Sequence, residues 1–143
     1  MKKLLLFTLT MLMLLTACNS ESAANSTPNT TEEVTSEETT LNYQQITQDK
    51  AKQIMNDEEN YIILDVRTQS EYDEGHIPNA ICVPNETIGS NDIPELPDKE
   101  QLILVYCRSG RRSKEAAAKL ADIGYTNIKE FGGIIDWTGD VVK

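Results

Sequence analysis

The chain has 143 residues, which favours a single folded domain. Its formal net charge is −10, and a strongly acidic protein is a poor partner for the phosphate backbone of nucleic acids, so none is expected to bind. The three cysteines and the one histidine form neither a CxxC pair nor a Cys/His cluster, so neither a metal site nor a cofactor is expected.

Residues 1–17 have the pattern of a bacterial export signal. Lys2 and Lys3 precede an apolar run from Leu4 to Leu15, which is too short for a comfortable membrane span. The run leads to LTAC at 15–18, which resembles the lipobox of bacterial lipoproteins. The resemblance implies cleavage before Cys18, lipidation of Cys18, and a protein held at the cell membrane with its domain on the extracytoplasmic side. The alternatives are an ordinary cleaved signal with an incidental cysteine and an uncleaved helical anchor.

Residues 18–40 are predicted to be the lipidated N-terminus followed by a disordered tether. From residue 19 onwards this segment consists mainly of Ser, Thr, Asn and Glu, and its only charged residues are acidic. Such a composition buries too little apolar surface to offset the conformational entropy that folding removes. We therefore expect the segment to hold the domain away from the membrane surface.

From Leu41 onwards apolar runs alternate with polar turns, and the folded domain is expected to span residues 41–143. This alternation favours an α/β domain with a central, mainly parallel sheet flanked by helices. Binding sites in such folds lie beyond the carboxyl ends of the strands. Strands are predicted at 61–66, 80–84, 102–105 and 127–131, and residues 46–47 form either a short strand or the entry to the domain. Helices are predicted at 48–56, capped by Thr47, and at 112–122, ended by Gly124, with short helices near 70–72 and near Trp137. Residues 91–99 are predicted to be a loop.

The sequence CRSGRRS, residues 107–113, lies between the strand at 102–105 and the helix at 112–122. Three of the four arginines lie within five residues of Cys107. Inward N–H groups, the positive end of the helix dipole and these cations stabilise both a thiolate and an anion bound beside it. Such surroundings lower a cysteine pKa from about 8.5 to roughly 3.5–7.5, and the thiolate is the nucleophilic form. The simpler interpretations are a buried, unreactive cysteine and a solvated basic face. Neither of them explains why three arginines cluster at one turn.

Three blocks of the sequence resemble single-domain rhodaneses, which are sulfurtransferases. They are LDVR…EY…GHIPNAICVP at 64–84, CRSGRRS at 107–113 and GGI…W at 132–137, and the resemblance covers residues 41–143. It implies a rhodanese-like three-layer domain. It also implies that Cys107 attacks the outer sulfur of a small anionic donor such as thiosulfate, forms a persulfide, and passes the sulfur to cyanide or a thiol. Asn79 and Cys82 depart from the common family pattern at positions away from the reactive loop.

The resemblance also implies which residues bind the substrate. Inward N–H groups of the loop would hold the sulfur or the leaving sulfite, and Gly110 would permit a backbone conformation closed to other residues. Arg108 and Arg111 are expected to reach the donor's oxyanion, because guanidinium groups suit oxyanions, whereas Arg112 also has a possible role in bracing the loop. The expected substrate-binding set is Arg108, Ser109, Gly110, Arg111, Arg112 and Arg67.

Four further residues have competing roles. Arg67 either contacts the substrate or pairs with an acid such as Glu71. His76 is expected to be a structural turn histidine and not a general base, because the loop has its own positive field. Asp65 is expected to brace a turn, and Cys82 to be a buried strand residue instead of a second reactive thiol.

Other functions are weighed against sulfur transfer. A related Cys-based phosphatase or arsenate reductase uses a Cys-x5-Arg loop, but here the arginine comes one residue early, at Arg112, and Ser113 follows it. The smaller ring suits one sulfur atom better than a tetrahedral phosphate. A non-catalytic or persulfide-carrying module would differ from an enzyme mainly in its acceptor. Nothing in the sequence demands an oligomer, so a monomer is expected.

Overall fold

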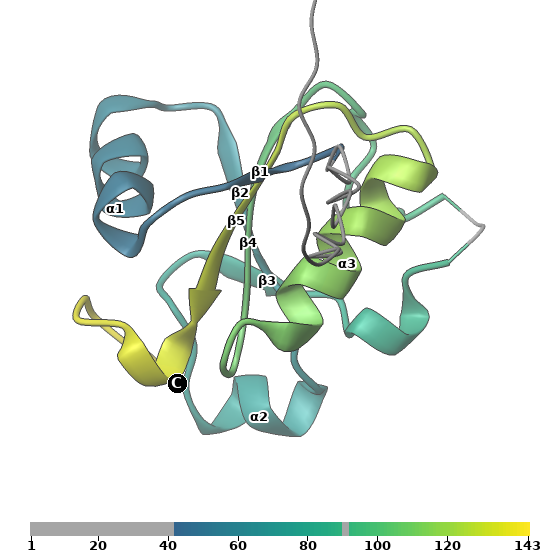
Figure 1. Cartoon of the computed structure of the whole chain (residues 1–143). Coiled ribbons are helices and arrows are strands. Elements are labelled where there is room, and N and C mark those ends of the chain that lie inside the picture. Colours follow the sequence, from purple (N-terminus) through teal and green to yellow (C-terminus); the bar gives the residue numbers. More distant parts are fainter. Residues whose placement is uncertain (1–41, 90–91) are drawn as a thin grey trace, which may run out of the picture. The chain divides into compact units, whose positions relative to one another are not determined.

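The computed structural model describes residues 42–89 and 92–143 (Figure 1). The predicted export signal, the predicted lipidation site at Cys18 and the predicted tether lie outside the described residues, as does Leu41. Within the described part of the chain, no helix combines the length and the apolar character needed to cross a membrane.

In the described residues, five strands form one sheet, and all of them run parallel in the order β1-β5-β4-β2-β3. This confirms the predicted α/β architecture. The first strand lies at 44–45 and not at the predicted 46–47, because the pairing with Lys129 and Glu130 of the neighbouring strand ends before Thr47 caps the next helix. The strands are β1 Gln44–Gln45, β2 Tyr61–Asp65, β3 Ala80–Cys82, β4 Leu102–Cys107 and β5 Ile128–Gly133.

Helices surround this sheet at nearly the predicted positions. Thr47 caps the first helix, as predicted, by accepting the N–H of Lys50 at 3.1 Å. Thr68 and Glu71 form a capping box at the start of the second helix. Gly124 follows the third helix in the left-handed conformation, with φ +98, and ends it as predicted. The helices are α1 Gln48–Asp57, α2 Gln69–Glu74 and α3 Arg111–Asp122, with 3-10 turns η1 Asn85–Thr87 and η2 Ile134–Asp136.

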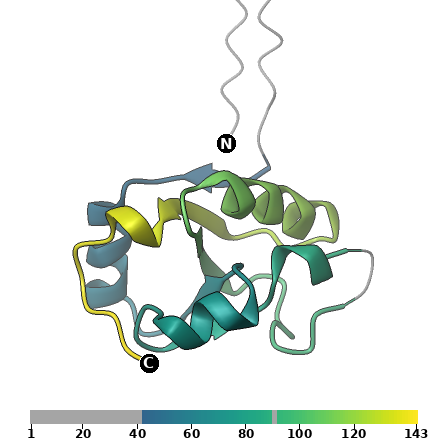
Figure 2. The ribbon, with the colours of Figure 1, turned by 90° about the horizontal axis from the view of Figure 1, so that it is seen from below.

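Alternate strand residues face two apolar cores, one on each side of the sheet. Along β4, Ile103, Val105 and Cys107 belong to the core that α3 covers, whereas Leu104 and Tyr106 belong to the core that α1 covers. Figures 1 and 2 show α1 and α3 on opposite sides of the strands. The domain therefore has three layers, as predicted, and Cys107 lies on the α3 side of the sheet.

A bulge in β5 shapes the sheet beside Cys107. Val105 pairs with Glu130, but Cys107 pairs with Gly133, so β5 holds one more residue than β4 between these two pairs. Gly132, inside the bulge, has φ +95, a left-handed conformation that favours glycine. The bulge places Gly133 directly against the loop that follows β4.

Candidate active site

The loop between β4 and α3 wraps its backbone around the sulfur of Cys107. The Cys107 side chain is buried, and its Sγ accepts the N–H of Gly110 at 3.1 Å. Gly110 has φ +97, a left-handed conformation that favours glycine, and it immediately precedes the first turn of the 12-residue helix α3. The sulfur thus lies at the N-terminus of a helix, where unpaired N–H groups point toward it.

These donors stabilise the ionised form of the sulfur. Burial raises the pKa of the Cys107 thiol, but hydrogen bonds from the Ser113 hydroxyl and from the N–H groups of Ser113, Ser109 and Gly110 lower it. The hydrogen bonds outweigh burial, so the pKa of Cys107 lies below the ordinary value of a cysteine. A thiolate is therefore favoured here, and the groups that favour it most directly are backbone N–H groups and one hydroxyl.

The loop closes against β5 because position 133 has no side chain. A Cβ atom added to Gly133 would overlap the carbonyl oxygen of Arg108 and lie 2.5 Å from the Cα of Ser109. The N–H of Ile135 donates to that same carbonyl oxygen at 3.2 Å. The backbone at 108–109 is thus fixed by β5 and by the turn η2, which holds the N–H groups in place around the sulfur.

Arg112 braces the loop from the other side. Its guanidinium donates two hydrogen bonds of 2.7 Å to the carboxylate of Glu71 on α2. This bidentate pair is the main cause that lowers the pKa of Glu71 from 4.5 to about 2. Because Glu71 also accepts the N–H of Thr68 in the capping box, one carboxylate joins the first turns of α2 and α3.

Arg67 is buried and pairs with an acid, which is one of its two expected roles, but the acid is Asp65 and not Glu71. Its guanidinium donates to both carboxylate oxygens of Asp65 at 2.6–3.0 Å and to the carbonyl oxygen of Gly75 at 2.8 Å. The fully buried Asp65 carboxylate also accepts the hydroxyl of Tyr106. Asp65 therefore braces the end of β2, as predicted. Glu71, the acid named as an example for this pairing, is held by Arg112 instead.

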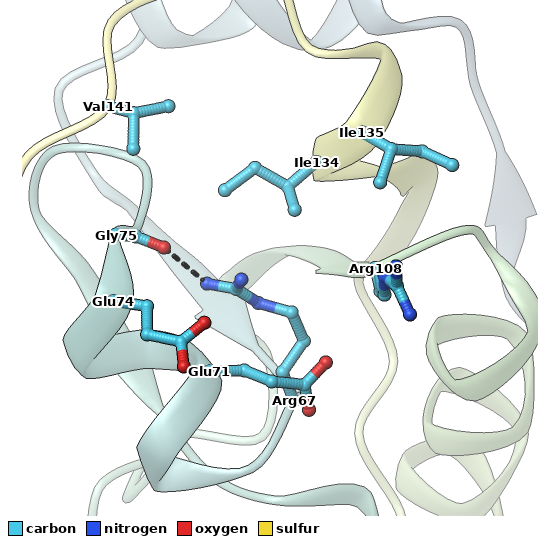
Figure 3. A pocket seen from close by; sticks show the side chains of 8 residues that line it. All are labelled: Arg67, Glu71, Glu74, Gly75, Arg108, Ile134, Ile135 and Val141. Atoms are coloured by element: carbon cyan, nitrogen blue, oxygen red, sulfur yellow. Dashed lines mark hydrogen bonds between the residues drawn. The ribbon is translucent and has the colours of Figure 1, made fainter.

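A pocket of about 570 Å³ opens at the carboxyl edge of the sheet, a size suited to small molecules (Figure 3). In Figure 3 the apolar side chains of Ile134, Ile135 and Val141 lie on one side of it, and the carboxylates of Glu71 and Glu74 lie on another. Cys107 is not part of the wall, but its neighbour in the chain is. The wall consists of Arg67, Glu71, Glu74, Gly75, Arg108, Ile134, Ile135 and Val141.

Two of the predicted substrate-binding arginines have exposed side chains. Arg108 lines the pocket and is exposed. Arg111 is 79 % exposed and lies 3.4 Å from Glu115, one turn further along α3. Ser109, between them in the loop, is exposed as well. These side chains are accessible to an anion, in contrast to Arg67 and Arg112, whose side chains are largely buried in ion pairs with Asp65 and Glu71.

Residues 47–140 match the model of the rhodanese-like domain. The chain belongs to this family. The thiosulfate sulfurtransferase PspE of Escherichia coli is 34 % identical over 80 residues, which cover 56 % of this chain and 77 % of that protein. A sulfurtransferase of Allochromatium vinosum is 36 % identical over 94 residues, which cover 65 % of this chain and 86 % of that protein. A solved rhodanese with anions, from E. coli, has a TM-score of 0.54 at 32 % identity and covers 58 % of this chain and 98 % of that chain.

Other features of this rhodanese-like domain agree with structural roles. His76 stacks on Tyr72 with ring centroids 3.7 Å apart, and its Nδ1 lies 3.0 Å from the Tyr72 carbonyl oxygen. Cys82 is partly buried in β3, and burial is the main cause that raises its pKa to about 11. Neither residue points to acid–base chemistry at Cys107. In residues 42–89 and 92–143, no cluster of three or more metal-ligating side chains occurs.

Two residues of the site, Ser113 and Glu130, were not among the sequence-predicted site residues. Ser113 is fully buried at the start of α3, and its hydroxyl donates to the carboxylate of Glu130 at 2.6 Å. The alternation of side chains along the predicted strand at 127–131 indicates that Glu130 is buried, because Ile128 and Glu130 share one face of that strand. An acid on the same face as a core isoleucine requires a buried polar partner.

Proposed function

We propose that this protein is a sulfurtransferase that moves a sulfane sulfur from a donor such as thiosulfate to a thiol or cyanide through a persulfide on Cys107. The observation that carries this proposal is the Cys107 sulfur at the N-terminus of α3, with the N–H of Gly110 donating to it at 3.1 Å. The membership of the rhodanese-like family and the sulfurtransferase relatives support the same chemistry.

The proposed reaction has two half-reactions. In the first, the Cys107 thiolate attacks the outer sulfur of thiosulfate, a new S–S bond forms at Sγ, and sulfite leaves with the electron pair of the broken bond. In the second, an acceptor thiolate or cyanide attacks the outer sulfur of the persulfide, and the Cys107 thiolate leaves. No external oxidant or reductant is needed, because the sulfane sulfur passes between nucleophiles.

The arginines divide into two proposed roles. Arg108 and Arg111 are accessible, and we assign them to the oxyanion of the donor, together with the exposed loop residue Ser109. The bidentate Arg112–Glu71 pair and the buried Arg67–Asp65 pair favour bracing for the other two arginines. Arg67 still borders the pocket, so a bound anion would lie near its charge.

Phosphoryl transfer is the weaker candidate on this geometry. A Cys-based phosphatase needs an arginine that is free to bind the phosphoryl oxygens in the transition state. The arginine nearest to that position, Arg112, is committed to Glu71 by two hydrogen bonds of 2.7 Å. A persulfide-carrying module remains the alternative to an enzyme, because it would use the same loop and differ in its acceptor.

We further propose that cleavage precedes Cys18 and that lipidated Cys18 anchors the protein to the cell membrane, with residues 18–40 as a tether and the domain on the extracytoplasmic side. The support is the sequence pattern of residues 1–18 alone. Each buried CH₂ of an acyl chain contributes about 0.8 kcal/mol to membrane binding, so two or more chains anchor a protein stably.

Persulfide formation tests the proposed function directly. The purified chain is incubated with thiosulfate alone, and intact mass and peptide mapping locate any added sulfur. We expect the wild type to gain one sulfur atom on the peptide that contains Cys107, the Cys107→Ser variant to gain none, and the Cys82→Ser control to behave as the wild type. Catalytic turnover is measured as the production of thiocyanate after cyanide is added. Hydrolysis of an aryl phosphate without any reaction with thiosulfate would contradict the proposal.

A further inference from the structure

Glu130 is a buried acid beside the reactive loop. It is 3 % exposed on β5 and faces α3. Its Oε1 accepts the hydroxyl of Ser113 at 2.6 Å and the N–H of Gly132, in the bulge, at 2.8 Å. Among the ion pairs of the described residues, none includes Glu130. A buried carboxylate without a cation is costly to a fold, so this residue calls for an explanation beyond packing.

The Ser113 hydroxyl links this carboxylate to the sulfur of Cys107. The Ser113 hydroxyl has one proton to donate, but four acceptors compete for it, three oxygens and one sulfur. The oxygens are Glu130 Oε1 at 2.6 Å, the Gly110 carbonyl at 3.0 Å and the Gly132 carbonyl at 3.3 Å. The fourth acceptor is the Cys107 sulfur, whose ionised form the same hydroxyl stabilises.

The shortest of these contacts indicates which acceptor competes most strongly for the proton. A separation of about 2.5–2.7 Å is typical of a hydroxyl that donates to an ionised carboxylate. The 2.6 Å contact therefore shows that Glu130 competes with the thiolate for the Ser113 proton, so the hydroxyl stabilises the thiolate less than it would without the carboxylate. In addition, the Glu130 carboxylate places a negative charge one hydroxyl away from the sulfur, and a like charge at such a separation opposes ionisation of the Cys107 thiol.

We infer that Glu130 is a positioning residue which, by holding the Ser113 hydroxyl, limits how strongly the Cys107 thiolate is stabilised. This inference rests on the proposed function, in which Cys107 is a nucleophile in the first half-reaction and a leaving group in the second. A less stabilised thiolate is a stronger nucleophile but a poorer leaving group. Glu130 would thus balance the two half-reactions against each other.

Other ionisable groups near Glu130 bear on this balance. Tyr43, in the segment before β1, has a pKa raised first by burial and then by the charge of Glu130. Cys107 at the end of β4 and Ser113 on α3 are the other side chains that contact the pair. Arg112 on α3 is a nearby cation, whose pKa is raised first by its hydrogen bond with Glu71 and in smaller part by the charge of Cys107, so it stays charged. Tyr43 stays neutral at ordinary pH, because its pKa lies above that of a free tyrosine. The Cys107 sulfur is therefore the group expected to respond to a change at Glu130.

The Glu130→Gln variant tests the inference, because the amide oxygen can accept both hydrogen bonds of Oε1 while the charge is lost. The rate of Cys107 alkylation by iodoacetamide is measured against pH in the full chain, with peptide mapping to separate Cys107 from the other thiols. We expect the midpoint of this profile to fall by about one pH unit in Glu130→Gln, because a like charge has been removed. Asp122→Asn, the same charge change at an exposed position on α3, is the matched control and is expected to keep the wild-type midpoint.

The two half-reactions are then expected to change in opposite directions. At a pH where Cys107 is fully ionised in both proteins, persulfide formation should slow by about threefold in Glu130→Gln, since nucleophilicity falls as the thiol pKa falls. Discharge of the persulfide to cyanide should quicken, because a more stable thiolate leaves faster. A purely structural role would slow both steps together, and that result would overturn the inference.

A second variant guards against loss of folding. Glu130→Asp keeps the charge but shortens the side chain, so the Ser113 proton is released to the thiolate and the alkylation midpoint should again fall. If the alkylation midpoint is unchanged in both folded variants, the inference is overturned. If the midpoint shifts in Glu130→Gln but not in Glu130→Asp, Glu130 does not act on Cys107 through the Ser113 hydroxyl. If the wild type forms no persulfide, the proposed function fails, whereas the alkylation profiles still decide whether Glu130 acts on Cys107.

Discussion

At the scale of single residues, the site depends on two glycines that place backbone where side chains cannot fit. Gly110 turns the loop with φ +97 so that its N–H donates to the Cys107 sulfur. Gly133 lets the loop backbone at Arg108 lie directly against β5. Besides the Ser113 hydroxyl, three backbone N–H groups stabilise the thiolate, so the geometry of the backbone affects the reactivity of the cysteine.

Gly133→Ala tests this dependence on the backbone. The added methyl group would overlap the Arg108 carbonyl oxygen, so the loop has to move away from β5. We expect a loss of about 1–3 kcal/mol in the free energy of unfolding, as for other overpacked sites, together with slower persulfide formation. Urea unfolding and the mass assay measure these effects. Gly89→Ala is the matched control, because no atom lies within 4 Å of the position of its Cβ.

At the scale of secondary-structure elements, one ion pair fastens α2 to α3. Arg112 on α3 and Glu71 on α2 are 41 residues apart in the chain, and their two hydrogen bonds of 2.7 Å close one side of the loop. The Glu71 side chain is 27 % exposed and that of Arg112 16 % exposed, so water only partly weakens the pair. α2 has six residues, too few to be stable alone, and this contact helps to hold it.

Glu71→Gln should therefore destabilise the domain in a pH-dependent way. Folding lowers the Glu71 pKa from 4.5 to about 2, so the contribution of the pair is complete above pH 4.5 and is lost as the pH falls toward 2. Allowing for partial exposure, we expect a loss of about 1–2 kcal/mol at pH 7. Urea unfolding at pH 7 and pH 3 measures the difference between wild type and variant, which should be smaller at pH 3. The exposed Glu74→Gln is the control, and an equal loss at both pH values would contradict the prediction.

At the scale of the whole molecule, the parallel sheet gathers the site. Because β2, β4 and β5 all run in one direction, their carboxyl ends bring Arg67, Arg108 and Ile134 to one pocket. The two cores on either side of the sheet keep these strand ends in register. The chain has a net charge of −10, and both Glu71 and Glu74 line the pocket, so the proposed donor anion is attracted only at short range, by the exposed Arg108.

The proposed anchor makes a prediction for the intact protein in its cell. Mass spectrometry of the mature N-terminus should find acylated Cys18, and the protein should fractionate with membranes. A Cys18→Ala variant should lose both properties while its rhodanese-like domain still forms the persulfide. A free α-amino group on Asn19 or Ser20 would contradict the proposal and favour an ordinary cleaved signal.

The amino-acid sequence by itself determined the elements of this domain, because strands, caps and turns follow from local patterns. The apolar run at 102–105, the glycine at 110 and the helix formers after it were enough to place Cys107 at the junction of a strand and a helix. The tertiary structure alone decided that Arg112 pairs with Glu71, where β5 bulges beside β4, and that Ser113 meets Glu130. These contacts join side chains from different elements, and their geometry depends on strand register and helix packing, which no local pattern specifies.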